Sequence, residues 1–510
     1  MRRTSALPVL CTALLLSTAT ADAGLFDSNG YPSHGRAIDA LKPAADYSDL
    51  VKNRPLAISI MRTRGQGFVP SPELHAYAQG VMMRLLKGVN LPPSFRPEVH
   101  ILATPEFTGE CTPDGTLIIS VGLLELLETE DELAFVMGHE LAHAIYRHQP
   151  RDWYKKAQFY AVVNGTAIDA FAQSQFGDQT NADIARAQDV AQHMAKLSAN
   201  VLMPRMAKGD EDAADALGFD LMVKAGYDPE APLAVMDKLA AQEAEAAADA
   251  QAARDATKKN GGGGSGSLLD KFSLDKVTAL ASGQITTDQA ADIAIFAFDT
   301  AVDSMADDAT THHPAKERED LLSAYLYGAY RDAAPVSPTP LPWAPDSKSP
   351  LKPKLTALLG HYTDAENAAA WIADANQGTQ AGAQADVGRA ITAPTGGHAY
   401  TEYVAAEFYD GSHKDKLSEA ALVRAAGGPE PSWEIYSRLL DVYVAHNNYK
   451  AAQALMDRAV IRFEDSPVLL PKRIQLLRLE GRSADAQALV PKCKSYDIDE
   501  LTAACKKEAG

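Results

Sequence analysis

The sequence predicts an α+β protein that is mainly helical, with a small sheet in its N-terminal half and helical repeats at its C-terminal end. An amphipathic stretch at residues 71–89 is followed by two short apolar runs, EVHILA and TLIIS, that are typical of strands. The segments after these runs return to helical patterns. From Tyr409 onward, large and small residues recur in register every 34 positions. A helical domain with a small sheet, followed by stacked helix pairs, accounts for these observations.

Length and composition limit the classes of protein to consider. The chain has 510 residues, of which 46% are hydrophobic and 23% charged, as expected for a folded protein with two or three domains. The formal net charge is −19 and no basic stripe is present, so we expect no nucleic-acid partner. No stretch after the first 23 residues reaches the roughly 18 uninterrupted apolar residues of a spanning helix, so we expect no integral membrane span.

The first 23 residues have the layout of a secretory signal peptide. Arg2 and Arg3 precede a short apolar run, and Ala21-Asp22-Ala23 is typical of a cleavage site after Ala23. A membrane anchor is the alternative, although the apolar run is short for one.

Three cysteines remain after such cleavage. Cys493 and Cys505 are close in the sequence and could form a disulfide in an oxidising compartment, with two free buried cysteines as the alternative. Cys111 would be an unpaired thiol.

The clearest chemical motif lies in TEDELAFVMGHELAHAIYRH, residues 129–148. His139 and His143 are four residues apart, so on a helix they lie about 40° apart and can bind one Zn²⁺. Glu140 lies one step round, where its carboxylate can serve as general base on a metal-bound water. His148 is expected about 140° away from His143 and is not predicted to be a ligand. The alternative is a surface helix with incidental histidines.

A catalytic zinc needs a third protein ligand, and KGDEDAADALGFDLMVKAGYDP at 208–229 supplies a candidate. Glu211, Asp215 and Gly218 recur on one face of a helix. Glu211 is predicted to bind the zinc, and Asp215 to hold a ligating imidazole by a hydrogen bond. The alternative for Glu211 is a solvated acid on an acidic helix.

Together these motifs resemble a known family. HELAH followed by EDAADALG, which matches Glu-x-x-Ala-Asp-x-x-Gly, is similar to the zinc metallopeptidases of the CAAX prenyl protease and HtpX type. The resemblance covers roughly residues 50–330 and implies a gluzincin-type domain with one zinc ion per chain. The sequence departs from the family at Thr108–Cys111, a segment that resembles the family's substrate-binding edge.

A third element of the resemblance is THHPAKERED at 311–320. It is similar to the His-Pro…Arg segment that brings another histidine to the zinc in periplasmic members. His313 is the matching position, which implies a fourth ligand or a transition-state stabiliser. Arg318 falls one residue closer than the usual spacing. The alternative for His313 is a loop histidine before a turn proline.

The predicted organisation has five parts. A glycine tract predicts a flexible insertion that is either a lid or a plain surface loop, and a proline-rich stretch predicts a semi-rigid, extended spacer at a domain boundary. The 34-residue period resembles tetratricopeptide repeats, with a plain helical bundle as the alternative. The bounds are 1–23 for the signal peptide, 24–334 for the peptidase domain with its insertion at about 241–270, 335–354 for the linker and 355–510 for the repeats.

The sequence therefore predicts a secreted, periplasmic zinc endopeptidase, and the resemblance implies that it acts on unfolded or misassembled envelope proteins. A substrate strand is expected to pair with the sheet near Thr116–Ser120. The resemblance to periplasmic members implies that the repeats recruit protein, with the outer-membrane assembly machinery as partner. The alternative is an autoinhibited, peptidase-like chaperone or adaptor that binds proteins mainly through its repeats.

Overall fold

The computed structural model describes most of the chain. The described residues are 31–32, 35–42, 46–62, 67–105, 107–149, 153–155, 157–158, 161–162, 206–259, 313–373 and 375–510. The predicted signal peptide and the glycine tract lie outside them. The first part of the expected insertion, up to Lys259, is the end of helix α9 (Ala231–Lys259). No described helix is both long and apolar enough to cross a membrane.

The sheet has three strands in the order β1-β3-β2: β1 is Glu98–Leu102, β2 is Gly109–Cys111 and β3 is Thr116–Ser120. β3 is central, because β1 pairs with it in parallel and β2 pairs with it antiparallel. The expectation that a substrate strand adds near Thr116–Ser120 is therefore wrong. Both edges of β3 already have partners, and the outer strand next to the active-site helix is β2.

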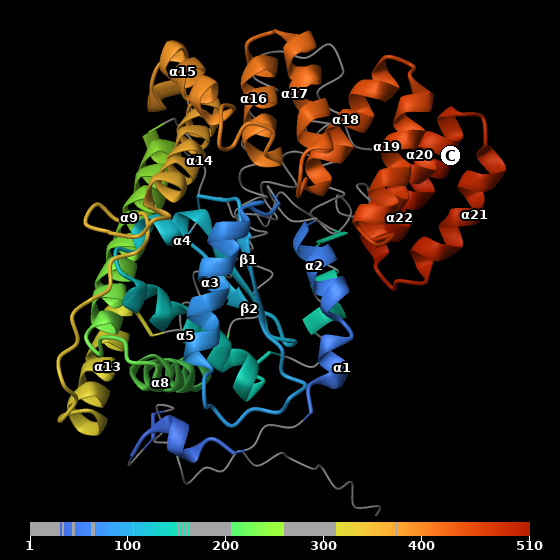
Figure 1. Cartoon of the computed structure of the whole chain (residues 1–510). Helices are drawn as coiled ribbons and strands as arrows, with labels where there is room; N and C mark the ends of the chain where they lie inside the picture. The colour runs from blue at the N-terminus through green and yellow to red at the C-terminus, as the bar shows by residue number, and fades with distance from the viewer. Residues whose placement is uncertain are drawn as a thin grey trace, which may run out of the picture.

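The helices of the N-terminal part surround this sheet (Figure 1). α9 and α13 lie side by side along one flank, on the left in the figure, and α5 lies between them and the sheet. The bounds are η1 Ala37–Ala40, α1 Ser48–Val51, α2 Arg54–Arg62, α3 Pro72–Leu85, α4 Val121–Leu126, α5 Glu130–Tyr146, α8 Lys208–Lys224 and α13 Ala315–Ala329.

The two motif-bearing helices, α5 and α8, cross at a pair of glycines. A Cβ atom at Gly138 would lie 2.9 Å from the carbonyl oxygen of Gly218, and one at Gly218 would lie 2.6 Å from the amide nitrogen of His139. Only residues without a side chain allow the two backbones to approach so closely. This crossing brings the His-Glu-x-x-His turn against the turn that carries Glu211.

The first turn of α5 is fastened by three consecutive acidic residues. Thr129 caps the helix by accepting a hydrogen bond from the amide of Glu132, as expected for a capping residue. The side chains of Glu130, Asp131 and Glu132 are all buried and bind α3, the α8–α9 connection, the proline-rich segment and α9. Their partners are Tyr77, Arg84 and Tyr227 for Glu130, the amides of Asp228 and Thr339 for Asp131, and Lys238 for Glu132.

The proline-rich segment at 335–354 packs on the peptidase domain instead of spanning a gap. The amide of Glu130 donates to the carbonyl of Thr339 at 2.7 Å, and Trp343 Nε1 donates to the carbonyl of Leu124 at 3.2 Å. Leu341 is fully buried. The expected spacer is therefore fastened beside the start of the active-site helix, because its extended backbone pairs with residues 128–130.

The C-terminal region is an array of helices joined mostly by short connections (Figure 1). α17, α19 and α21 begin at Asp415, Tyr449 and Ser483, so their starts are 34 residues apart. Each buries small residues at matching positions, namely Ser418, Ala452 and Ala486, and Ala425, Ala459 and Cys493. The bounds are α14 Lys352–Ala373, η2 Ala375–Gln377, α15 Gln380–Ala390, α16 Ala399–Gly411, α17 Asp415–Gly427, α18 Trp433–Ala445, α19 Tyr449–Arg462, η3 Pro467–Leu469, α20 Leu470–Leu479, α21 Ser483–Lys494 and α22 Asp499–Ala509.

The array contacts the N-terminal part at several places, two of which involve α14 and the α17–α18 connection. At one, α14 lies by α3 and α4, where Lys354 pairs with Glu73 and Thr363 donates to Glu125. At the other, Glu430 in the α17–α18 connection pairs with Arg62 of α2 at 3.0 Å, and a Cβ atom at Gly67 would lie 2.5 Å from the Glu430 carbonyl oxygen. In Figure 1 the array accordingly passes over the top and right of the sheet-bearing part.

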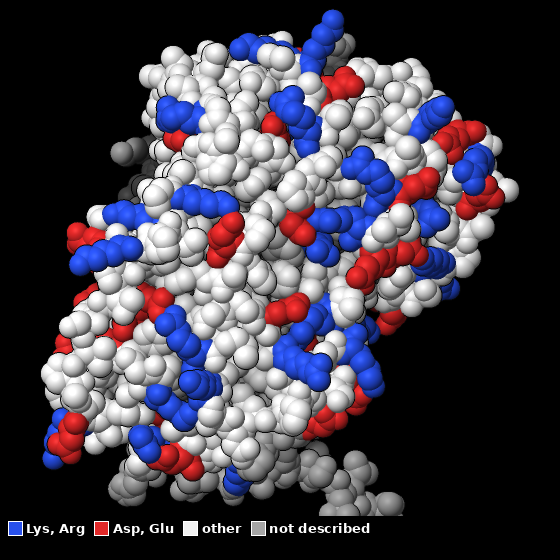
Figure 2. Space-filling model, viewed as in Figure 1, with Lys and Arg blue, Asp and Glu red and all other residues white. Residues whose placement is uncertain are grey.

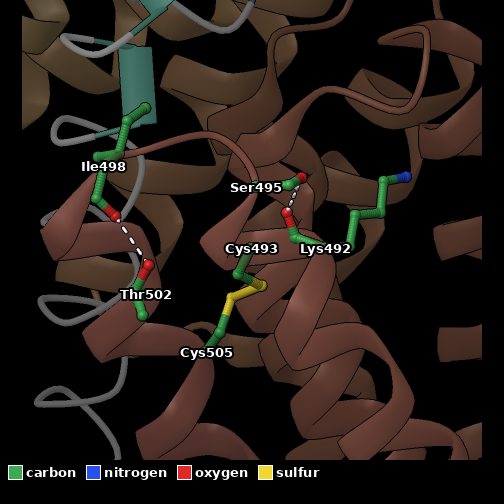
Figure 3. Close-up of a disulfide and its surroundings, with 6 residues drawn as sticks. All are labelled: Lys492, Cys493, Ser495, Ile498, Thr502 and Cys505. Carbon is green, nitrogen blue, oxygen red and sulfur yellow. Dashed lines mark hydrogen bonds between the residues drawn. A yellow bond between two sulfur atoms is a disulfide. The ribbon is translucent and has the colours of Figure 1, made fainter.

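A disulfide joins the last two helices of the array. Cys493 of α21 and Cys505 of α22 are bonded, with their Cα atoms 6.5 Å apart, and both are fully buried (Figure 3). Cys111 in β2 is a buried free thiol.

Candidate metal centre

Three side chains of the metal-binding type converge where α5 crosses α8. His139 and His143 come from successive turns of α5, and Glu211 comes from the first turn of α8. The two Nε2 atoms are 3.2 Å apart, and each lies 3.5 Å from a carboxylate oxygen of Glu211. All three side chains are buried. In the part of the chain that the structure describes, this is the one group of three such residues within ligand distance of each other.

This geometry fits a zinc ion. Two atoms bound to tetrahedral zinc at about 2.0–2.1 Å lie roughly 3.3 Å from each other, close to the separations seen here. Two imidazoles and one carboxylate are also a known donor set of catalytic zinc, which keeps its fourth position for water. The residues that the sequence predicted as ligands are therefore brought together in an arrangement that zinc can occupy.

Glu140 lies between the two histidines in the sequence and faces β2. A Cβ atom at Gly109 would lie 3.4 Å from Glu140 Cγ and 3.5 Å from its Oε1. Burial raises the pKa of Glu140 to about 7, and the nearby Glu211 and Glu110 carboxylates add to the rise, while His139 opposes it. A carboxylate with a pKa near neutrality is suited to accept and return a proton.

Asp215 holds the ring of His139 as the sequence predicted. Its Oδ1 lies 2.8 Å from His139 Nδ1, which leaves Nε2 directed at Glu211 and His143. Burial would raise the pKa of Asp215, but the Arg318 guanidinium and the His139 hydrogen bond lower it below the ordinary value. For His139 burial lowers the pKa, whereas Asp215 and Glu211 outweigh it and raise the pKa to about 10.

His148 contacts the site, which the helical-period argument did not predict. Its Nδ1 lies 2.9 Å from Nδ1 of His143. The helix ends at Tyr146, and Arg147 takes a left-handed conformation (φ 59°, ψ 47°) that turns the chain back. Glycine or asparagine usually takes the left-handed conformation at the end of a helix, and either residue would have indicated the reversal in the sequence. Arginine stands at this position instead, so that signal was absent.

His313 is not brought to the three converging ligands. Its Nε2 lies 3.3 Å from Oδ2 of Asp212, and its Nδ1 lies 2.8 Å from Oε1 of Glu317. The same segment reaches the site through Arg318, which binds Asp215. A role for His313 as fourth ligand or transition-state stabiliser stays a prediction.

Comparison with known proteins matches residues 72–323 to the model of peptidase family M48. This part of the chain belongs to that family. The matched range contains both motif-bearing helices, β1–β3 and the His313–Arg318 segment. The family match therefore covers the sheet together with α5 and α8, the helices that carry His139, His143 and Glu211.

Similar proteins carry metallopeptidase names. Mitochondrial metalloendopeptidase OMA1 of Schizosaccharomyces pombe is 26% identical over 187 residues, which are 36% of this chain and 50% of that protein. Mitochondrial metalloendopeptidase OMA1 of Arabidopsis thaliana is 29% identical over 151 residues, 29% of this chain and 27% of that one. The β-barrel assembly-enhancing protease of Escherichia coli K12 is 25% identical over 195 residues, 36% of each chain. The matches therefore span half or less of the length of these relatives.

Proposed function

We propose that this protein is a zinc-dependent endopeptidase that hydrolyses peptide bonds of unfolded or misassembled envelope proteins. One observation carries the proposal: His139, His143 and Glu211 converge at zinc-ligand separations beside the buried carboxylate of Glu140. A helix that served only as scaffold would not need four buried polar groups at one point, since burial of such groups is costly without a function.

The residues divide the chemistry between them. His139, His143 and Glu211 would hold the zinc, which supplies a water of lowered pKa and polarises the scissile carbonyl. Glu140 takes the proton of the attacking water and passes it to the leaving amine. Asp215 and Arg318 keep the His139 ring oriented while this happens.

The outer edge of β2 supports an extended polypeptide as substrate. Thr108 and Thr112 bond to β3, so the alternate residues Gly109 and Cys111 direct their backbone groups outward, where Gln149 Nε2 already donates to the Cys111 carbonyl at 2.6 Å. Gly109 carries no side chain between this edge and Glu140. An unfolded segment can therefore pair with β2 beside Gly109 and present its backbone to the general base.

We assign protein recruitment to the helical array, by stacked pairs of the tetratricopeptide type. Basic and acidic side chains are interspersed on the face shown in Figure 2, over both parts of the molecule, which suits a protein partner better than a polyanion. The buried Cys493–Cys505 disulfide supports an oxidising compartment such as the periplasm. The name of the Escherichia coli relative supports a link to outer-membrane assembly, whereas the relatives from Schizosaccharomyces pombe and Arabidopsis thaliana are named as mitochondrial.

His313 would act on this site from the α13 side. As a resting ligand it would limit basal cleavage, and His313→Ala would raise turnover. As an oxyanion stabiliser it would leave zinc affinity unchanged, and the same substitution would lower turnover.

The decisive experiment combines metal analysis with casein cleavage. We expect about one zinc per chain, cleavage that stops with a chelator, and recovery when zinc is added back. A protein that binds zinc but never cleaves unfolded polypeptide would instead be the autoinhibited adaptor, and a protein that binds no zinc would refute the metal site.

A further inference from the structure

The end of α5 places His148 against a predicted zinc ligand. The left-handed residue Arg147 lets the amide of His148 donate to the carbonyl of His143 at 3.0 Å, so the His148 ring lies over the last turn. Tyr47 fixes this end of the helix, because its hydroxyl donates to the carbonyls of Ala144 and Ile145, each at 3.0 Å. The backbone conformation at the end of α5 therefore sets the position of His148.

The ring of His148 is held in one orientation. It stacks on the Tyr146 ring with centroids 5.3 Å apart and planes 22° apart, and it meets the His143 ring nearly edge-on. Its side chain is only 10% exposed. Nδ1 therefore points at His143 Nδ1, while Nε2 faces Asp210 Oδ1 at 3.7 Å.

The protons on these rings can be assigned from the ligand geometry. His143 directs Nε2 at His139 and Glu211, so a metal bound there leaves the proton of a neutral His143 on Nδ1. That N–H needs an acceptor, and the atom 2.9 Å away is Nδ1 of His148. His148 then carries its own proton on Nε2, toward Asp210. We propose, on the basis of the zinc site proposed above, that His148 is a positioning residue that accepts the Nδ1–H of His143 and fixes that ring for metal binding.

The two zinc-binding imidazoles would therefore be oriented by different groups. His139 relies on a carboxylate, Asp215, whereas His143 relies on a neutral imidazole. Loss of the orienting partner of a metal-bound histidine commonly weakens metal affinity by about 10–100-fold.

The test compares two substitutions in the full chain. His148→Phe keeps a ring that can stack on Tyr146 but removes the acceptor. His148→Asn removes the ring but places an amide oxygen close to where Nδ1 was. We expect zinc affinity, measured by competition with a chelator, to fall about 10–100-fold in His148→Phe and to stay within about threefold of wild type in His148→Asn. The visible spectrum of the Co²⁺-substituted protein should change in the same order.

Stability of the metal-free protein separates this role from simple packing. The melting temperature without metal should differ little between wild type and His148→Phe. His398→Phe is a control, because His398 is a partly buried histidine of the array that hydrogen-bonds Tyr362, and its loss should leave zinc affinity unchanged. If His148→Phe does not fold, His148→Gln serves as the acceptor-free variant, because its longer side chain moves the amide away from the position of Nδ1 by one methylene group.

The outcomes distinguish the two levels of the proposal. Wild-type protein that binds no zinc would refute the proposed function itself. If the wild-type protein binds zinc, either of two results would refute the positioning role alone. One is an acceptor-free variant that binds zinc as tightly as wild type, and the other is a His148→Asn variant that binds zinc as weakly as His148→Phe.

Discussion

Arg318 binds Asp215 through two parallel hydrogen bonds, from Nε to Oδ2 at 2.9 Å and from Nη2 to Oδ1 at 2.7 Å. Both side chains are largely buried, and Asp215 also holds His139. A bidentate arginine–carboxylate pair fixes both partners in a plane. The α13 segment is therefore coupled to the metal centre through a chain of three residues.

Replacement of Arg318 by Met should leave the Asp215 carboxylate buried without its partner. Removal of one member of a buried ion pair costs about 3–5 kcal/mol of unfolding free energy, and we expect zinc affinity to fall with it because the His139 ring is released. Urea unfolding and chelator competition measure the two effects. Arg389→Met is a matched control, since Arg389 is 55% exposed where it pairs with Asp364, and its loss should cost far less unfolding free energy. Equal losses in both variants would contradict this account.

The crossing of α5 and α8 should not tolerate a side chain at Gly218. In Gly218→Ala the added methyl group would lie 2.6 Å from the His139 amide nitrogen, so α8 has to move and carry Glu211 away from the two histidines. We expect loss of zinc binding, measured on the purified protein by metal analysis. Gly209→Ala lies on the same helix with nothing within 4 Å of the new atom and should keep its zinc. A zinc-replete Gly218→Ala protein would show that the close crossing is not needed.

Glu140→Gln separates metal binding from catalysis. The ligands are untouched and the variant keeps the size of the side chain, so zinc content should match wild type while peptide cleavage falls by at least about 10²-fold. Glu211→Gln is the contrasting variant, because it should weaken the metal as well. Near-normal cleavage by Glu140→Gln would remove the general-base assignment.

Gly67→Ala tests whether the docked array contributes to action on whole proteins. The new methyl group would lie 2.5 Å from the Glu430 carbonyl oxygen, which forces the array away from that contact. We expect the variant to retain zinc and cleavage of short peptides, yet to lose much of its cleavage of casein. Gly35→Ala has a similar positive φ, 80° against 83°, without any neighbour within 4 Å, and controls for backbone strain. If Gly67→Ala loses peptide cleavage and casein cleavage to the same extent while Gly35→Ala loses neither, the contact supports the catalytic fold itself.

The joint between α4 and α14 should loosen as pH rises. Burial and the neighbouring Glu125 carboxylate raise the pKa of Glu366 from the ordinary 4.5 to about 8, and its Oε1 has no hydrogen-bond partner among the described residues. The folded protein therefore binds more protons at Glu366 than the unfolded chain between about pH 4.5 and 8, so the unfolding free energy falls as pH rises through this window.

Glu366→Gln removes this titration. We expect the variant and wild type to unfold alike near pH 4, and the variant to be more stable by about 1 kcal/mol or more near pH 9. Burial also raises the pKa of Glu125, so part of the pH dependence should remain in the variant. Urea unfolding across the pH range measures the difference, and a gap that does not widen with pH would contradict the assignment.

Much of the site could be predicted because its residues share regular helices. The four-residue spacing of His139 and His143, and of Glu211 and Asp215, fixes their relative directions once a helix forms. The 34-residue spacing of α17, α19 and α21 was visible as well, because each of these helices has its small buried residues at the same positions. His148 was missed because the helix argument was carried past Tyr146, where Arg147 reverses the chain.

Features that depend on distant contacts were not predictable in this way. The order β1-β3-β2 is not the order of the sequence, so the choice of β3 as the pairing edge was wrong. The proline-rich segment has the composition of a spacer, yet backbone pairing with residues 128–130 fastens it. His313 was placed by resemblance, and the position of its ring depends on Asp212 and Glu317, whose directions the sequence does not reveal.

The three acidic residues in the first turn of α5 restrict a motion that would otherwise disable the enzyme. Consecutive residues on a helix point about 100° apart, so Glu130, Asp131 and Glu132 hold the helix from three sides. With ligand atoms roughly 6 Å from the axis, rotation of the helix by only about 20° would move His139 and His143 by about 2 Å. Metal–ligand distances tolerate deviations of only about 0.2 Å. Even a small rotation of α5 about its axis would therefore separate the zinc ligands, and the contacts of its first turn restrict that rotation.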